Sequence, residues 1–575
     1  MFKGEDVPDT TLCCRTQCGR TQCGTQSSSD FTQQVATLKY DCIIIGGGHN
    51  GLVCSTYLAK AGWKVLVLER RPMVGGACVT EELWPGFKVS TAAYVVSLLL
   101  PQIERDMQLK KYGYEVLRRV PSSFTPFADG RYLILGPDAE QNRREISKFS
   151  VKDAAAWPMY EKLLTAVAEK LEPILSATAP DLLPLPKTWR RRSLGKKIRD
   201  ARTAHSMYKA FEALGEQMPE AIELLTGAAR PILDRWFESP ELKGTLATDA
   251  VIGNFQSVAA PGTAYVLLHH VMGSSGGARG VWGYVKGGMG ALSEAMAMCA
   301  RDDGVEIRTN AAVSEILVSH GTIRGVRLED GEEILAGRVA SNVDANLTFR
   351  KMLDASHLPD SFVKAVDRID YSSATMKINL ALSELPDFTC LPGKEVGPQH
   401  CGTIHINAQM QDLEDAYFNA QQGFASRKPI VEMTIPTSVD RSIAPEGYHV
   451  ASLFVQYAPY QLANGQWDDA TKNAFADQCL NEIAKFAPNI HDAVVHRQIL
   501  SPVDLESVYG LTGGNIFQGA MPLHQLFSMR PVPGWADYRT PVNGLYLCGS
   551  AAHPGGGVMG ACGRNAATEM LRDGR

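Results

Sequence analysis

The chain has 575 residues, of which 45 % are hydrophobic and 21 % charged, and its formal net charge is −5 at pH 7. This length and composition predict a large globular protein that buries a sizeable core in two or more units. The negative charge argues against general affinity for nucleic acid, which needs a basic surface. No uninterrupted apolar run approaches the roughly 18 residues of a membrane span.

Residues 1–38 are rich in cysteine and carry the repeat Arg-Thr-Gln-Cys-Gly at 15–19 and again at 20–24. These cysteines are a residue type that binds metal, but no histidine lies near them and the segment has no pattern of a fold. We therefore expect a disordered leader over residues 1–38, without a metal. Its Lys3, Arg15 and Arg20 are mixed with acids, so a mitochondrial import signal is not evident. The remaining cysteines are scattered, which indicates reduced thiols.

A nucleotide-binding pattern follows. The apolar run 42–45 predicts a buried parallel strand, residues 52–60 predict a helix, and residues 64–68 predict a second strand that ends at an acid. Glycines with G-x-G-x-x-G spacing lie between the first strand and the helix. The complete order predicts a βαβ unit that binds a dinucleotide. The alternative, a glycine-rich turn in an unrelated α/β protein, is weaker because all four parts of the pattern are present.

Each conspicuous residue of this unit has a physical task. Gly46 permits the tight turn, Gly48 lets the backbone approach a pyrophosphate, and Gly51 lets the helix pack closely on the strand. The first N–H groups of the helix then face the phosphates. Glu69 can accept hydrogen bonds from both ribose hydroxyls, and it would repel a 2′-phosphate.

A second glycine pair, Gly75-Gly76, follows Glu69 with E-x5-G-G spacing. Here the sequence resembles the extended FAD signature of the amine oxidase, phytoene desaturase and retinol saturase superfamily. The resemblance implies that FAD is the cofactor, and that Glu69, Arg70, Gly75 and Gly76 contact it. A valine matching Val313 contacts the adenine through its backbone in that superfamily, although an ordinary buried strand residue would fit this position equally well.

The C-terminal stretch 544–571 resembles the flavin motif of the phytoene desaturase branch. An apolar strand, 545–548, leads through a glycine loop to a helix that begins near Gly560. Its N–H groups and dipole can stabilise negative charge on a reduced flavin. The resemblance implies FAD contacts at Gly549, Ser550, Val558 and Met559. Many related flavoproteins have an acid where Ser550 stands, which puts the ribityl contact in doubt.

These segments predict an α/β fold, with a Rossmann-like FAD-binding domain assembled from separated parts and an interleaved α+β substrate domain of mixed sheet and helix. We expect the division to follow these ranges: leader 1–38, FAD-binding segments 39–145, 291–345 and 506–575, a helix-rich cap 146–290, and a substrate-domain sheet 346–505. A hairpin is expected at 326–335, turning at Asp330-Gly331.

Two residues are candidates for chemistry. His553 lies between the last strand and the glycine loop, where it could carry a proton at neutral pH or simply fix the loop. Lys377 lies on the polar face of the alternating strand 375–382, where it could hold a water near flavin N5 or orient a substrate; the alternative is a lysine that faces solvent.

A disulfide reductase is a rival function, because those flavoenzymes carry two cysteines at C-x4-C spacing after a glycine pair. Cys78 has the first position, but Leu83 has the second, so no disulfide can form there. A second nucleotide fingerprint is also needed, and the nearest candidate, Gly288-Met289-Gly290, lacks a clean preceding strand. The pattern argues against this function.

The sequence therefore predicts an FAD-dependent oxidoreductase that transfers hydride between a C–H bond of an apolar small molecule and the flavin. The alternative is a regulatory or binding flavoprotein that retains FAD for stability. The resemblance implies the mitochondrial matrix, where a protein partner is conceivable. The basic run 189–202 could contact an anionic membrane, but we expect a solvated helix face there.

Overall fold

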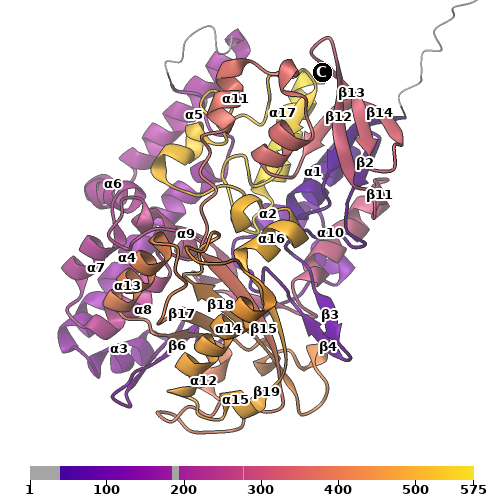
Figure 1. The fold of residues 1–575 in the computed structure, drawn as a ribbon. Coiled ribbons are helices and arrows are strands. Elements are labelled where there is room, and N and C mark those ends of the chain that lie inside the picture. The colour runs from indigo at the N-terminus through magenta and orange to yellow at the C-terminus, as the bar shows by residue number, and fades with distance from the viewer. Residues whose placement is uncertain (1–38, 184–192, 276–277, 575) are drawn as a thin grey trace, which may run out of the picture. The chain divides into compact units, whose positions relative to one another are not determined.

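The structure is a computed structural model that describes residues 39–183, 193–275 and 278–574 (Figure 1). The predictions for the leader, and for Arg190 to Arg192 of the basic run, lie outside the described residues. In the described part, no helix combines the length and apolar character that a membrane crossing needs.

The predicted βαβ unit is confirmed. Strand β1 (Tyr40–Ile45) pairs in parallel with β2 (Val65–Leu68), and α1 (His49–Lys60) connects them. The helix begins three residues before its predicted start, because the glycine turn closes within residues 46–48. Both strands are almost wholly buried, which agrees with their continuous apolar sequence.

This unit belongs to a seven-stranded sheet built from distant parts of the chain. Its parallel part has the order β11-β2-β1-β14, and β20 pairs in parallel with β14. The predicted hairpin is confirmed, since β13 and β14 are antiparallel and β12 extends them. The added strands are β11 (Glu306–Arg308), β12 (Val313–Ser319), β13 (Thr322–Leu328), β14 (Glu333–Ser341) and β20 (Leu545–Leu547).

A second seven-stranded sheet has the order β19-β15-β18-β17-β16-β6-β7. All its pairs are antiparallel except β16 with β6. Its strands are β6 (Ser123–Pro126), β7 (Tyr132–Leu135), β15 (Thr375–Leu382), β16 (Thr403–Ile406), β17 (Ile430–Thr434), β18 (His449–Gln456) and β19 (Val494–Leu500). The fold is thus mixed α/β, with two large sheets, the first of which contains the nucleotide motif. The described residues also form three two-stranded sheets: β3 (Glu81–Trp84) with β4 (Phe87–Val89), β5 (Val116–Arg118) with β10 (Gly283–Val285), and β8 (Ser274–Ser275) with β9 (Ala278–Arg279).

The predicted alternation of β15 is confirmed on its apolar face. Met376, Ile378, Leu380 and Leu382 form a buried cluster with side chains of α14 (Asp469–Ala484), which covers this face of the second sheet. The opposite face carries Lys377 and Asn379, and both are buried as well. A polar face that is shielded from solvent indicates an internal site.

Helices dominate residues 139–272 and form a separate apolar cluster. Several of them surround α9 in the left half of Figure 1. They are α3 (Ala139–Ser147), α4 (Val151–Leu175), α5 (Leu194–Glu212), α6 (Met218–Thr226), α7 (Ala229–Trp236), α8 (Pro240–Thr248) and α9 (Thr263–Met272). On the side of the first sheet lie α2 (Pro101–Asp106), α10 (Gly290–Asp302), α11 (Asp360–Val366) and α17 (Ala561–Asp573). Helix α16 (Pro502–Tyr509) contacts β19 of the second sheet, and α13 (Met410–Gln421) packs on α8.

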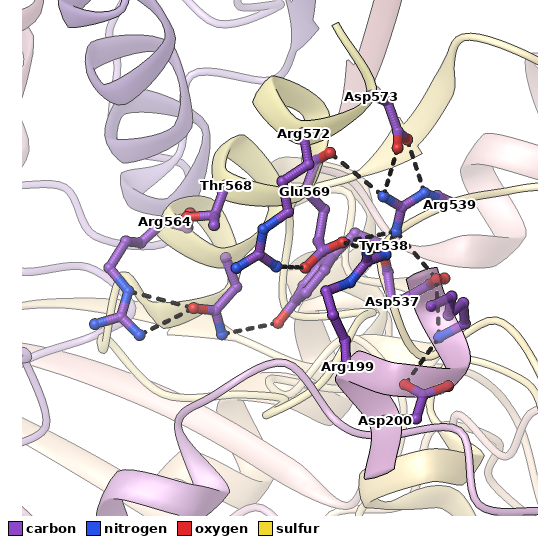
Figure 2. A network of polar contacts seen from close by, with 12 residues as sticks. Arg199, Asp200, Asp537, Tyr538, Arg539, Arg564, Thr568, Glu569, Arg572 and Asp573 are labelled. Carbon is purple, nitrogen blue, oxygen red and sulfur yellow. Dashed lines mark hydrogen bonds and ion pairs between the residues drawn. The ribbon is translucent and has the colours of Figure 1, made fainter. Parts of the chain in front are cut away.

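Charged residues join α5 to the C-terminal segment. Lys196 lies 3.2 Å from both Asp200 and Asp537, and all three side chains are almost fully buried. Arg539 continues the network to Asp537, Glu569 and Asp573 (Figure 2). The expectation of a solvated face is therefore wrong for Lys196, because this lysine neutralises buried carboxylates; it holds for Lys197, which is exposed.

Candidate cofactor and substrate site

The turn between β1 and α1 forms the first part of the site. Gly46 has a φ of +94°, and a Cβ atom on Gly51 would lie 2.4 Å from the Gly46 carbonyl oxygen. Glycine is therefore required at both positions. Gly48 is the N-cap of α1, and no side chain caps this helix, which leaves its first N–H groups for an anionic ligand.

Glu69 follows β2 and is held by the backbone around it. Its Oε2 accepts a hydrogen bond from the Gly47 N–H at 2.8 Å, and its Oε1 accepts one from the Arg71 N–H at 2.9 Å. Each carboxylate oxygen keeps a further lone pair for a sugar hydroxyl. The neighbouring Arg70 instead donates to the carbonyls of Ser507 and Val508 at 3.0 and 2.6 Å, which fixes α16 beside the site.

The second glycine pair lies directly against the first loop. The Gly75 N–H donates to the Gly47 carbonyl at 2.8 Å, and Gly75 has a φ of +118°. A Cβ atom there would lie 2.4 Å from the Cys78 carbonyl oxygen, so a larger residue would displace this turn. The E-x5-G-G spacing therefore brings two glycine turns together.

The C-terminal motif completes the same region. Ser550 accepts a hydrogen bond from Asn50 of α1 at 3.3 Å. Helix α17 packs so closely on α1 that a Cβ atom on Gly563 would lie 2.0 Å from the Asn50 carbonyl oxygen. Gly560, with a φ of +71°, is the N-cap of α17, which agrees with the predicted start. Residues from the two ends of the described chain thus lie side by side.

One cavity of about 740 Å³ includes these turns and extends to the second sheet. Its lining contains most of the residues predicted for cofactor and chemistry: Gly46, Gly48, Glu69, Arg70, Gly75, Gly76, Val313, Lys377, Ser550 and Val558. Four predicted residues are not in its lining: Gly51, Gly549, Met559 and His553. Gly51 and Gly549 lie behind it, where each allows two backbone segments to approach closely. Met559 packs into an apolar cluster.

The cavity's far end, here called the chamber, is formed by the polar face of the second sheet. Lys377 lies opposite Phe454 on β18, and Phe454 lies opposite Glu432 on β17. Directly opposed residues point to the same face of a sheet, so these three side chains form a row, and all three line the cavity. His405 of β16 continues the row beyond Glu432.

Lys377 is 2 % exposed, so the alternative of a lysine that faces solvent is wrong. Its ammonium nitrogen donates to Ser452 and lies 3.8 Å from the centroid of the Tyr94 ring. Burial lowers the pKa of Lys377 well below its usual range, while Glu432 acts in the opposite direction. Burial in turn raises the pKa of Glu432 to about 8, with Asp249 adding to this rise.

His553 lies elsewhere. It is buried, its ring centroid lies 5.1 Å from that of Phe527, and its backbone carbonyl accepts a hydrogen bond from Tyr538 at 2.6 Å. Burial, aided by the Arg530 guanidinium, lowers the pKa of His553 to about 3. The position therefore does not support the predicted role as proton carrier.

The geometry around Cys78 does not favour thiol chemistry. Cys78 lines the cavity, but burial raises the pKa of its thiol to about 11, so the reactive thiolate is disfavoured. Gly288 and Gly290 pack against Thr80, where a Cβ atom on Gly290 would lie 2.5 Å from the Thr80 nitrogen. The preceding strand β10 (Gly283–Val285) pairs antiparallel with β5 (Val116–Arg118), which is not a second βαβ unit.

The residues fit an FAD. Gly48 lies at the uncapped start of α1, where a pyrophosphate can approach the backbone. A Cβ atom at this position would lie 2.7 Å from the Asn342 side-chain nitrogen, so a larger residue would fill this space. Glu69 stands at the sugar position of the motif, and Val313, Ser550 and Val558 continue the lining.

Comparison with known proteins identifies the family. Residues 51–571 match the model described as flavin containing amine oxidoreductase. The chain belongs to this family. It is 46 % identical over 548 residues to "Pyridine nucleotide-disulfide oxidoreductase domain-containing protein 2" of Rattus norvegicus, covering 93 % of this chain and 94 % of that protein. It is 24 % identical to the phytoene desaturase of Neurospora crassa, covering 90 % and 82 %.

The fold also resembles solved structures. A putrescine oxidase bound to putrescine matches with a TM-score of 0.56 at 16 % identity, covering 93 % of this chain and 99 % of that one. At this identity the likeness concerns the fold alone. It agrees with the two-sheet architecture of an FAD-binding part and a substrate part.

Sequence reasoning missed three charged residues of the chamber: Arg119, Asp249 and Glu432. Arg119 and Asp249 lie outside any strand, and no local pattern marks them. Glu432 did leave a signal, because it is the one charged residue in the apolar run 429–435. A lone acid in a buried strand indicates a polar cavity or a partner.

Proposed function

We propose that this protein is an FAD-dependent oxidoreductase that transfers hydride between a C–H bond of a small molecule with an apolar body and flavin N5. The observation that carries the proposal is the single cavity that joins the glycine turns to the chamber. The relative named as a phytoene desaturase supports a substrate oxidised at carbon. The second half of the cavity has space and side chains that a purely structural cofactor would not need.

FAD, when bound, supplies the hydride acceptor or donor. The chain's own residues position the substrate and exclude water. Tyr94, Trp282 and Phe454 line the chamber with aromatic surface, which favours an apolar body and keeps the site dry. Lys377 is proposed to hold a water or a polar substrate atom at the reacting end, because its amine is buried, lines the cavity and is fixed by Ser452.

The decisive experiment mixes the oxidised protein with a lipid extract under anaerobic conditions and follows the flavin absorbance. We expect bleaching, with a compound in the extract that has lost two hydrogens. Gly48→Val should abolish FAD binding, because the side chain would fill the space of the pyrophosphate. The matched control, Gly195→Ala, lies in an open part of α5 and should retain full flavin.

Retention of flavin by Gly48→Val would show that this turn is not the cradle. Failure of every extract to bleach bound flavin would favour the regulatory flavoprotein over the enzyme.

We also propose a location in the mitochondrial matrix, which rests on the family resemblance of the sequence. Subfractionation of cells would test it, since release of the protein with cytosolic markers would contradict the proposal.

A further inference from the structure

Arg119 is a buried guanidinium that opens onto the chamber. It follows β5 and is 3 % exposed. Its Nε donates to the Trp282 carbonyl at 3.2 Å, its Nη1 donates to Thr403 at 2.9 Å, and the guanidinium lies 5.3 Å from the centroid of the Tyr284 ring. Within the described part of the chain it forms no ion pair.

This arrangement differs from that of the other deeply buried arginine. Arg530 donates to the carbonyls of Phe517, Gly519, Ala520 and Ser550, so its donors are used within the protein. Arg119 makes two hydrogen bonds and retains further N–H donors beside the cavity. Asp249 and Glu432 interact with this guanidinium electrostatically, but neither forms an ion pair with it and burial raises the pKa of both. A buried charge without a close partner is unfavourable, so a bound anion would stabilise this site.

The other ionisable groups of the chamber favour an anion over a cation. They are Tyr94, Asp249, His269, His270, Lys377 and Glu432. Burial raises the pKa of Asp249 and of Glu432, so the carboxyl of Glu432 is largely neutral at pH 7 and can itself donate a hydrogen bond. A guanidinium, in contrast, cannot be deprotonated in a protein. A cationic ligand would meet this fixed charge, whereas a carboxylate would be bound by it.

We propose that the substrate is a carboxylic acid with an apolar body, bound with its carboxylate at Arg119 and its body against Tyr94, Trp282 and Phe454. This inference rests on the proposed function, and it specifies the substrate class of the same cavity. A carboxylate matches the planar fork of a guanidinium, whose orientation is already fixed by Trp282 and Thr403. The aromatic residues then hold the carbon chain away from water.

The test compares three ligands of equal length on the FAD-loaded protein by titration calorimetry: octanoate, octanol and octylamine. Octanoate should bind at least about tenfold more tightly than the other two, because a charge-assisted hydrogen bond is stronger than a neutral one. Tighter binding of octylamine would overturn the proposal and assign the chamber to cations through Asp249 and Glu432. Equal binding of all three would also overturn it.

A pair of variants locates the carboxylate. Arg119→Met should weaken octanoate binding by about 10- to 100-fold and leave octanol binding unchanged. Arg118→Met is the matched control, because Arg118 is the exposed neighbour on β5 and should bind octanoate as the native protein does. Arg119→Lys keeps the charge and should bind with intermediate affinity. Undiminished octanoate binding by Arg119→Met would overturn the assignment of Arg119.

These measurements are independent of turnover. If octanoate binds selectively but no carboxylic acid reduces the flavin, the carboxylate site is supported and the proposed oxidoreductase activity is contradicted. If a neutral hydrocarbon reduces the flavin and octanoate is not preferred, the oxidoreductase activity is supported and the proposal of a carboxylic acid substrate is overturned.

Discussion

Lys377 and His553 both carry a side chain that can transfer a proton, but their surroundings differ. Lys377 lines the cavity beside Tyr94, whereas His553 is enclosed by Phe527 and Arg530 away from the lining. A proton carrier must reach the reacting group directly or through one water. Lys377 is therefore the better placed of the two candidates for proton transfer, whereas the His553 ring is a buried packing group with no hydrogen-bond partner among the described residues.

The variants of these two residues should behave differently. Lys377→Met should slow anaerobic flavin reduction by the identified substrate by about 100-fold or more. His553→Ala should lower the free energy of unfolding by about 2–4 kcal/mol through loss of buried packing, and leave the rate of reduction nearly unchanged. Stopped-flow absorbance and urea unfolding measure the two effects. A large rate loss in His553→Ala, with flavin content intact, would restore the histidine as proton carrier.

The residues of the two halves of the site also differ in how far the sequence determines them. Gly46, Gly48 and Glu69 lie in one short segment, where spacing specifies both conformation and partner. Arg119 and Asp249 lie outside any strand and meet Glu432 of β17 only through the packing of segments far apart in the chain, which no local pattern contains. Lys377 was found because a single charge in an alternating strand is visible locally; the same reasoning applied to β17 identifies Glu432.

At the scale of elements, α5 shows that a basic run can form ion pairs in the protein interior. The sequence correctly marks a charged helix, but not that its Lys196 meets Asp537 of a segment more than three hundred residues away. The pattern i, i+4 from Lys196 to Asp200 suits a solvated helix as well as a buried one. Only tertiary packing distinguishes them, since the partner carboxylate lies outside the helix.

The network of Figure 2 should therefore hold α5 in place. Lys196→Met leaves the buried Asp200 and Asp537 without this cation and should destabilise the protein by about 3–5 kcal/mol. Lys197→Met is the control, because this lysine is exposed and should change stability by less than about 0.5 kcal/mol. Hydrogen exchange should show faster exchange over residues 194–212 in Lys196→Met alone. Equal protection in both variants would mean that apolar packing, not the network, anchors the helix.

At the scale of the whole molecule, burial lowers the pKa of six histidines within the described part of the chain. The pKa falls to about 4 for His49 and His449 and to about 3 for His269, His405 and His553, and it is also lowered for His400. In the unfolded chain a histidine has a pKa of about 6.5, so the unfolded state binds more protons between these values. The stability that these residues contribute is present above about pH 6.5 and is lost as the pH falls.

The free energy of unfolding should consequently decrease on acidification, with each such histidine contributing up to about 1.4 kcal/mol per pH unit between about pH 6 and 4.5. Glu432 acts oppositely, since its raised pKa removes stability as the pH rises from about 4.5 to about 8. Urea unfolding at several pH values, with FAD in excess, measures the slope of the free energy of unfolding against pH.

His405→Gln should reduce this slope by about one proton, because His405 is buried and outside the cavity lining. His524→Gln changes an exposed histidine and should leave the slope as it is. A stability that does not change between pH 6.5 and 5, or equal slopes in the two variants, would show that these histidines do not govern the acid response.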